Sequence, residues 1–217
     1  MQHRKYILFD LDGTLSDPGE GIINSLIHAL KHFGIEGDPK ILRRFIGPPL
    51  TDSFKEYYDF DAKQTAEAIR LYRQYFHEHG IFQNILYPGM KELLEDLVWA
   101  GKTLAIATTK PEVYALEILE YFNINHLFRK ELVVGSFLDG RRTNKGELIA
   151  TVLERLGDKP QHMVMVGDRK FDFIGAKANG VEVIGVAYGY GDLEEIEAFE
   201  PTAIAHTVKE LRQLLLP

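Results

Sequence analysis

The sequence predicts an α/β protein with a doubly wound parallel sheet and a group of helices inserted after the first strand. From Pro88 onward, apolar runs alternate with amphipathic helical segments, as in the crossover units that build a parallel sheet. Before Pro88, about 70 residues of helical periodicity follow the first strand, which is far longer than a normal crossover. We therefore expect a core made of residues 1–16 and 87–217, and a helical domain at 17–86.

The first strand is the apolar run at 6–9, and two carboxylates, Asp10 and Asp12, follow it directly. Ionised acids are costly to bury unless they are paired or bind a metal ion. In open α/β sheets, ligands bind at the carboxyl ends of the strands. The position of these two acids therefore indicates a functional site.

The inserted segment is expected to hold four helices and no convincing strand. In the first helix, apolar residues recur every three or four positions until Gly34, with Asp17 as a possible N-cap and Pro18 in the first turn. The other three helices are expected at 39–45, 51–58 and 62–79. The chain is expected to hinge near Asp17 and again near Tyr87-Pro88.

The rest of the chain alternates between the two kinds of element. Helices are expected at 90–100, 112–122, 145–156, 171–179 and 208–215. Strands are expected at 103–107, 131–134, 162–166 and 182–187, with a last short strand at 203–205.

Composition excludes several classes of function. The 217 residues include 32 acidic and 25 scattered basic residues, for a net charge of -7, so a nucleic-acid partner is not expected. There is no cysteine, which excludes a disulfide scaffold, a zinc-thiolate site and cysteine catalysis. No signal region or apolar run of about 18 residues occurs, so we expect a cytoplasmic protein without a membrane partner. The sequence leaves the oligomeric state open.

Three of the expected strands end in polar groups. Asp10 and Asp12 follow the first, Thr108 follows the second, and Asp168 follows the strand at 162–166, with Asp172 four residues later. Parallel strands would bring these groups to one edge of the sheet. Lys145 begins the helix before that third strand and can reach the same edge.

These motifs, in this order between residues 5 and 172, resemble those of the haloacid dehalogenase superfamily, phosphatase branch. The matching residues are Asp10-Leu11-Asp12-Gly13-Thr14, Thr108, Lys145 and Gly167-Asp168 with Asp172. The resemblance extends to phosphoglycolate phosphatase-like enzymes. It implies a Rossmann-like core with an inserted all-α, helical-bundle cap that closes over the site.

The resemblance also implies a role for each motif residue in a Mg²⁺-dependent phosphatase. Asp10 would attack phosphorus to form an aspartyl-phosphate, since a carboxylate is ionised at neutral pH. Asp12 would protonate the leaving alcohol and later deprotonate the attacking water. Thr108 and Lys145 would bind the phosphate oxygens.

Mg²⁺ would be held by Asp10, Asp168 and the backbone carbonyl of Asp12, with Asp172 touching the ion or its water shell. Thr109 is expected to bind substrate together with two residues of the cap, Arg44 and Gly47. A solvated helix face is the default interpretation of Arg44, and Gly47-Pro48-Pro49 could be a plain turn between helices. The Tyr188-Gly189-Tyr190-Gly191 stretch is expected to be structural.

The expected substrate is a small phosphorylated metabolite whose identity the sequence does not reveal. Asp12 favours phosphatase or phosphomutase chemistry over the dehalogenases and ion-pumping ATPases of the superfamily. The alternatives are a 5′-nucleotidase or pyrophosphatase of the same family and a phosphomutase of the β-phosphoglucomutase type. A non-enzymatic receiver-like module, phosphorylated on aspartate, is a further alternative, although it would not need 70 residues of inserted helix.

Overall fold

The computed structural model describes residues Met1–Pro217, and the chain divides into two compact units. The larger unit comprises Met1–Ser16 and Leu86–Pro217, and the smaller comprises Asp17–Ile85. Strands β2 (Ser16–Asp17) and β3 (Ile85–Leu86) pair with each other where the chain leaves and rejoins the larger unit. No strand was expected in 17–86, and two-residue strands are too short for periodicity to reveal.

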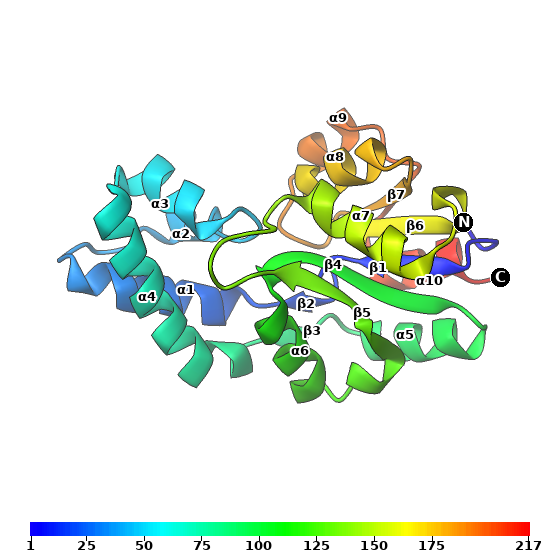
Figure 1. Cartoon of the computed structure of the whole chain (residues 1–217), viewed down its shortest axis with the longest axis horizontal. Helices are drawn as coiled ribbons and strands as arrows, with labels where there is room; N and C mark the ends of the chain where they lie inside the picture. The colour runs from blue at the N-terminus through cyan, green and yellow to red at the C-terminus, as the bar shows by residue number, and fades with distance from the viewer. The chain divides into compact units, whose positions relative to one another are not determined.

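The larger unit contains a six-stranded, wholly parallel sheet in the order β5-β4-β1-β6-β7-β8 (Figure 1). Its strands are β1 (Tyr6–Phe9), β4 (Thr103–Pro111), β5 (Phe128–Ser136), β6 (Met163–Gly167), β7 (Glu182–Val186) and β8 (Ala203–Ala205). The chain adds β4 and β5 on one side of β1, then β6, β7 and β8 on the other. This order confirms the prediction of a doubly wound α/β fold, and it puts the carboxyl end of β1 where ligands bind in such sheets.

Helices cover both faces of this sheet. They are α5 (Met90–Trp99), α6 (Glu112–Tyr121), α7 (Lys145–Leu156), α8 (Lys170–Ala178), α9 (Leu193–Ala198) and α10 (Val208–Leu215). Figure 1 shows α5 and α6 on one face, with α7 and α8 on the other. Leu148, Phe173 and Ile196, from α7, α8 and α9, join one buried apolar cluster with the strand side chains beneath them.

Two differences from the expected elements have physical causes. The strand expected at 103–107 extends to Pro111, because β5 pairs with β4 as far as Pro111 opposite Ser136, across an irregular register. Helix α9 was not predicted. Its six residues include only one buried side chain, Ile196, so no helical period is visible in the sequence.

Helix α7 begins at a well-defined cap. The Asn144 side chain accepts hydrogen bonds from the backbone N–H groups of Gly146 (2.8 Å) and Glu147 (3.3 Å). The helix ends at Gly157, whose φ of +61° is the left-handed conformation that glycine adopts at low cost. The cap fixes Lys145 as the first residue of the helix.

The smaller unit is helical. It contains α1 (Gly19–His32), α2 (Pro39–Arg43), α3 (Leu50–Tyr58), α4 (Ala62–Glu78) and the 3₁₀ turn η1 (Gly80–Phe82). Asp17 accepts a hydrogen bond from the N–H of Gly19 (2.9 Å), but the N-cap residue is Pro18, one position later than expected. Across the whole chain, no helix combines the length and apolar character that a membrane crossing requires.

Candidate active site

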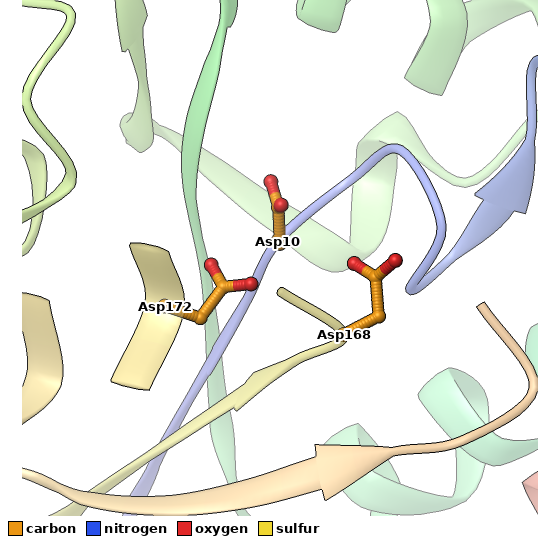
Figure 2. A group of neighbouring side chains, drawn as sticks. All are labelled: Asp10, Asp168 and Asp172. Atoms are coloured by element: carbon orange, nitrogen blue, oxygen red, sulfur yellow. The ribbon is translucent and has the colours of Figure 1, made fainter. Parts of the chain in front are cut away.

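Three buried carboxylates meet at the carboxyl edge of the sheet. Figure 2 shows the side chains of Asp10, Asp168 and Asp172 pointing into the same region from three separate segments. One oxygen of each lies within 4.8 Å of the others. Such a group of buried acids can hold a metal ion, and it is expensive to leave without a counter-charge.

The fold brings these acids together because β1 and β6 are neighbours. Asp10 directly follows β1, and its N–H donates to the carbonyl of Val166 in β6 (2.9 Å). Asp168 follows the end of β6 directly. Asp172 lies in the first turn of α8, where its Oδ2 accepts a hydrogen bond from the N–H of Arg169 (3.1 Å).

Lys145 supplies the positive charge of this acidic cluster. Its Nζ lies 2.9 Å from Oδ1 of Asp10 and 2.8 Å from Oδ1 of Asp172, and it donates to the carbonyl of Ala107 (3.0 Å). Only 3% of its side chain is exposed. Burial alone would lower the pKa of Lys145, but the two carboxylates raise it above its usual value, so the amine stays charged.

One lysine does not neutralise three carboxylates. Burial, with Asp172 and Asp10 nearby, raises the pKa of Asp168 to about 8. Burial also raises the pKa of Asp172 to about 6, although Lys145 opposes the shift. A divalent cation would displace these protons, and an all-oxygen carboxylate set is the chemistry that Mg²⁺ prefers. The residues present therefore fit a magnesium ion.

Asp12 lies outside this cluster and has its own cation. Nζ of Lys110 lies 2.6 Å from Oδ2 of Asp12, and their side chains are only 4% and 13% exposed. Oδ1 of Asp12 is buried without a hydrogen-bond partner in the protein. Burial raises the pKa of Asp12 and Lys110 opposes that shift. The Asp12 carboxylate is thus separate from the acidic cluster. The expected contact between a metal ion and the backbone carbonyl of Asp12 remains a prediction.

Lys110 is a residue of the site that the sequence motifs do not include. Its position two residues after Thr108 would indicate a place in the site if both residues belonged to one strand. The sequence predicts that this strand ends at residue 107. In the structure β4 continues through both residues, and both are buried. Because side chains two apart in a strand share a face, a longer strand would have directed attention to Lys110.

Thr108 lies at the same edge of the sheet. Phe9 of β1 is level with Ile106 of β4, so Asp10 and Thr108 both lie just beyond this pair. Thr108 is 1% exposed, and its Oγ1 accepts a long hydrogen bond (3.3 Å) from the N–H of Lys110. Thr109 is half-buried on the same strand, and its expected contact with substrate stays a prediction.

The other two expected substrate contacts belong to the smaller unit. Arg44 is exposed and caps the C-terminus of α2. Gly47 has a φ of +108°, which suits glycine and accounts for its place in the turn before α3. Their contact with substrate also remains a prediction.

Comparison with known proteins relates the chain to hydrolases. Residues 7–186 match a family model described as haloacid dehalogenase-like hydrolase. A 5′-nucleotidase from Pseudomonas aeruginosa is 46% identical over 210 residues, covering 96% of this chain and 94% of the relative. Tyrosine-protein kinase PtkA from Mycobacterium tuberculosis is 38% identical over 214 residues, covering 96% of this chain and 72% of the kinase.

Two further matches support the same relationship. A phosphoglycolate phosphatase from Vibrio vulnificus is 31% identical over 226 residues, covering 99% of this chain and 97% of the relative. Among solved structures, a predicted phosphatase from Clostridium acetobutylicum is 42% identical, with a TM-score of 0.92 over 97% of both chains.

Proposed function

Because the chain belongs to the haloacid dehalogenase-like hydrolase family and is a phosphatase of that family, we propose that it hydrolyses small phosphate monoesters with Mg²⁺. The reaction would proceed in two steps, through an acyl phosphate formed on the Asp10 carboxylate. The sequence motifs resemble those of enzymes that use this chemistry, and the family match supports a hydrolase.

The observation that supports the proposal best is that Asp10 and Asp12, two residues apart, each pair with a different lysine. Asp10 lies beside Lys145 and within 4.8 Å of two further carboxylates, whereas Asp12 pairs with Lys110. The first environment suits a nucleophile next to a metal ion. The second suits a carboxyl group that exchanges a proton.

In the first step, a carboxylate oxygen of Asp10 attacks phosphorus and the ester P–O bond breaks. Asp12 gives its proton to the departing alcohol oxygen. Burial raises the pKa of Asp12, which favours the protonated form that this step needs. Lys145 reduces the repulsion between Asp10 and the incoming phosphate dianion, and Thr108 hydrogen-bonds one of its oxygens.

In the second step, Asp12 takes a proton from a water molecule, whose oxygen attacks phosphorus. The bond between phosphorus and Asp10 then breaks, which releases inorganic phosphate and restores both carboxyl groups. Mg²⁺ would be held by Asp10, Asp168 and the backbone carbonyl of Asp12, with Asp172 at the ion or its water shell, and it would neutralise phosphate charge in both steps.

The substrate class is proposed from the relatives. Nucleoside 5′-monophosphates are the first candidates, because the 5′-nucleotidase relative shares 46% identity while the phosphoglycolate phosphatase relative shares 31%. We assign substrate selection to the helical unit at 17–85, which the chain enters soon after Asp10. Arg44 and Gly47 are its expected contact residues, and Arg44→Ala should raise KM more than it lowers kcat.

The test is a screen of nucleoside monophosphates, phosphoglycolate, pyrophosphate and hexose monophosphates with excess Mg²⁺, comparing kcat/KM. Sustained phosphate release is expected, with the highest kcat/KM for a nucleotide. Conversion of a hexose phosphate into its isomer without phosphate release would instead indicate a phosphomutase. A single stable phosphorylation of the protein would indicate a receiver-like module, and phosphate transfer to protein tyrosine would indicate a kinase.

Asp10→Asn tests the mechanism. The amide keeps the shape of the side chain but cannot form the acyl phosphate, so kcat should fall by about 10³-fold or more. The control is Asp96→Asn, which removes only a surface ion pair with Arg212. Near wild-type turnover by Asp10→Asn would exclude Asp10 as the nucleophile.

A further inference from the structure

The loop Tyr188–Gly191, which follows β7, packs directly against Asp168. The N–H of Tyr190 donates a hydrogen bond to Oδ2 of Asp168 (2.8 Å). The Asp168 side chain is completely buried. A backbone amide therefore holds one oxygen of a carboxylate that belongs to the acidic cluster.

The same loop also reaches the segment after β1. The hydroxyl of Tyr188 donates to the backbone carbonyl of Thr14 (3.1 Å). The hydroxyl of Thr14 in turn donates to Oδ1 of Asp168 (3.3 Å), and Thr14 is fully buried. The chain of contacts is thus a closed ring, from Tyr188 through Thr14 and Asp168 to Tyr190, which holds both oxygens of the carboxylate.

The glycines of this loop are required by close packing. A Cβ on Gly189 would lie 2.5 Å from Cβ and 2.6 Å from Oδ2 of Asp168, and it would overlap the carbonyl oxygen of Gly13. A Cβ on Gly191 would overlap the carbonyl oxygen of Asp168. Neither glycine has a positive φ, so contact with Asp168 and Gly13, and not backbone conformation, accounts for them.

We propose that the loop Tyr188–Gly191 is a positioning clamp for the proposed metal site, which fixes Asp168 in the orientation that binds Mg²⁺. The inference rests on the proposed function, because it takes Asp168 as a metal ligand. Groups that hydrogen-bond metal ligands fix the ligand's orientation, and their loss typically weakens metal binding by about 10–100-fold. The clamp acts through Asp168 and does not touch substrate.

The two informative variants are Tyr188→Phe and Gly189→Ala. Tyr188→Phe removes only the hydroxyl and keeps the ring, which packs edge-on against Tyr87 at a centroid distance of 4.8 Å. Gly189→Ala drives a methyl group against the Asp168 carboxylate. If the alanine variant fails to fold, Tyr188→Phe alone decides.

Each variant has a matched control away from the site. Tyr6→Phe removes a hydroxyl that donates to Asp158 (3.0 Å) at the amino end of β1. Gly101→Ala strains a glycine at φ +78° that has open space around it, so it costs stability without touching Asp168.

The main measurement is the Mg²⁺ dissociation constant of the metal-free protein by titration calorimetry. We expect it to rise about 10–100-fold in Gly189→Ala and about tenfold in Tyr188→Phe, and to stay unchanged in both controls. Phosphatase activity of the two clamp variants should recover toward wild type as Mg²⁺ is raised, whereas the two controls should reach full activity at the Mg²⁺ concentration that saturates the wild type.

Three outcomes separate the possibilities. If the wild-type protein binds Mg²⁺ and the clamp variants bind it equally well, the clamp is excluded while the proposed function stands. If Tyr6→Phe weakens Mg²⁺ binding as much as Tyr188→Phe does, the weaker binding results from a general loss of stability and the clamp is excluded. If the wild-type protein binds no Mg²⁺, the metal site and the clamp are both excluded.

Discussion

Nζ of Lys110 lies 2.6 Å from Oδ2 of Asp12, and both side chains are largely buried. The contact occupies one oxygen of the proposed proton-transfer group and leaves the other, Oδ1, without a hydrogen bond in the protein. The pair therefore orients Asp12 and stabilises its ionised form. The second effect opposes burial, which favours the protonated form.

Lys110→Met should change the pH dependence of catalysis. Loss of the positive charge raises the pKa of Asp12, so the carboxyl group keeps its proton to higher pH. The alkaline limb of the kcat/KM profile should therefore move upward, while kcat falls by about tenfold or more because Asp12 loses its orientation. Lys177→Met, at an exposed position of α8, is the control. An alkaline limb that stays in place or moves downward would contradict this role.

Lys145→Met should destabilise the metal-free protein more at pH 8 than at pH 5. At pH 8 the variant leaves Asp10 and Asp172 without their buried cation, a loss of the kind that costs about 3–5 kcal/mol. At pH 5 Asp172, whose pKa is raised to about 6, is already largely protonated, so the loss is smaller. Urea unfolding at the two pH values, with Lys177→Met as control, measures the difference. Equal losses at both pH values would argue against this charge balance.

Mg²⁺ should stabilise the protein more strongly as the pH rises. The pKa of Asp168 is raised from 3.8 to about 8 in the folded state, so the folded state retains a proton that the unfolded state has lost. Without metal, the contribution of this group to stability is full below about pH 4 and is lost as pH rises toward 8. Mg²⁺ binds the ionised form, so the Tm difference between excess Mg²⁺ and EDTA should grow from pH 5 to pH 8.

The same measurement on Asp168→Asn is the control, since an amide cannot titrate. Its Tm in EDTA should depend less on pH over this range, and excess Mg²⁺ should raise its Tm less than it raises that of the wild type. A wild-type difference that shrinks as the pH rises would contradict the argument.

Arg142 and Arg141 both lie over the Phe137 ring, but the Arg142 side chain is 14% exposed and that of Arg141 is 75% exposed. Arg142 donates to Glu112 (2.5 Å) and to the carbonyl of Gly135 (2.8 Å), and its guanidinium lies 4.2 Å from the ring centre of Phe137. Arg142→Ala should lower the free energy of unfolding by about 1.5–3 kcal/mol.

Arg141→Ala provides the comparison, because 75% of the Arg141 side chain is exposed and its ion pair is with Asp139 on the surface. It should change the free energy of unfolding by at most about 0.5 kcal/mol. Arg142→Lys should recover little, because a lysine cannot reproduce the two-pronged geometry of the guanidinium. Denaturant unfolding of the three variants gives the ranking, and equal effects of the two alanine variants would refute it.

The sequence was most informative where apolar residues recur at a helical or strand spacing, or where a capping residue begins or ends an element. Helices α7 and α10 and strand β8 begin and end where expected, because their caps and apolar spacing are clear. Asp10, Asp168, Asp172 and Lys145 were expected at one edge of the sheet, and the structure brings them together there.

What the sequence could not reveal depends on contacts between distant segments. The pairing of Lys110 with Asp12 required β4 to continue past residue 107, and only its pairing with β5 determines that. The contact of Tyr190 with Asp168 uses a backbone N–H, which every residue except proline possesses. A contact of this kind cannot be predicted from a pattern of side chains. Gly189 and Gly191 are the only residues of the loop whose type indicates close packing.

The central place of β1 in the sheet has a consequence for how the protein is made. Both neighbours of β1 come much later in the chain, with β4 beginning at Thr103 and β6 ending at Gly167. A ribosome therefore releases the strand that precedes Asp10 long before either partner exists, and long-range pairing of this kind is slow. The helices of the smaller unit follow one another directly, so their contacts can form early. The acidic cluster can assemble only once about four-fifths of the chain has been synthesised, because Asp172 is the last of its residues.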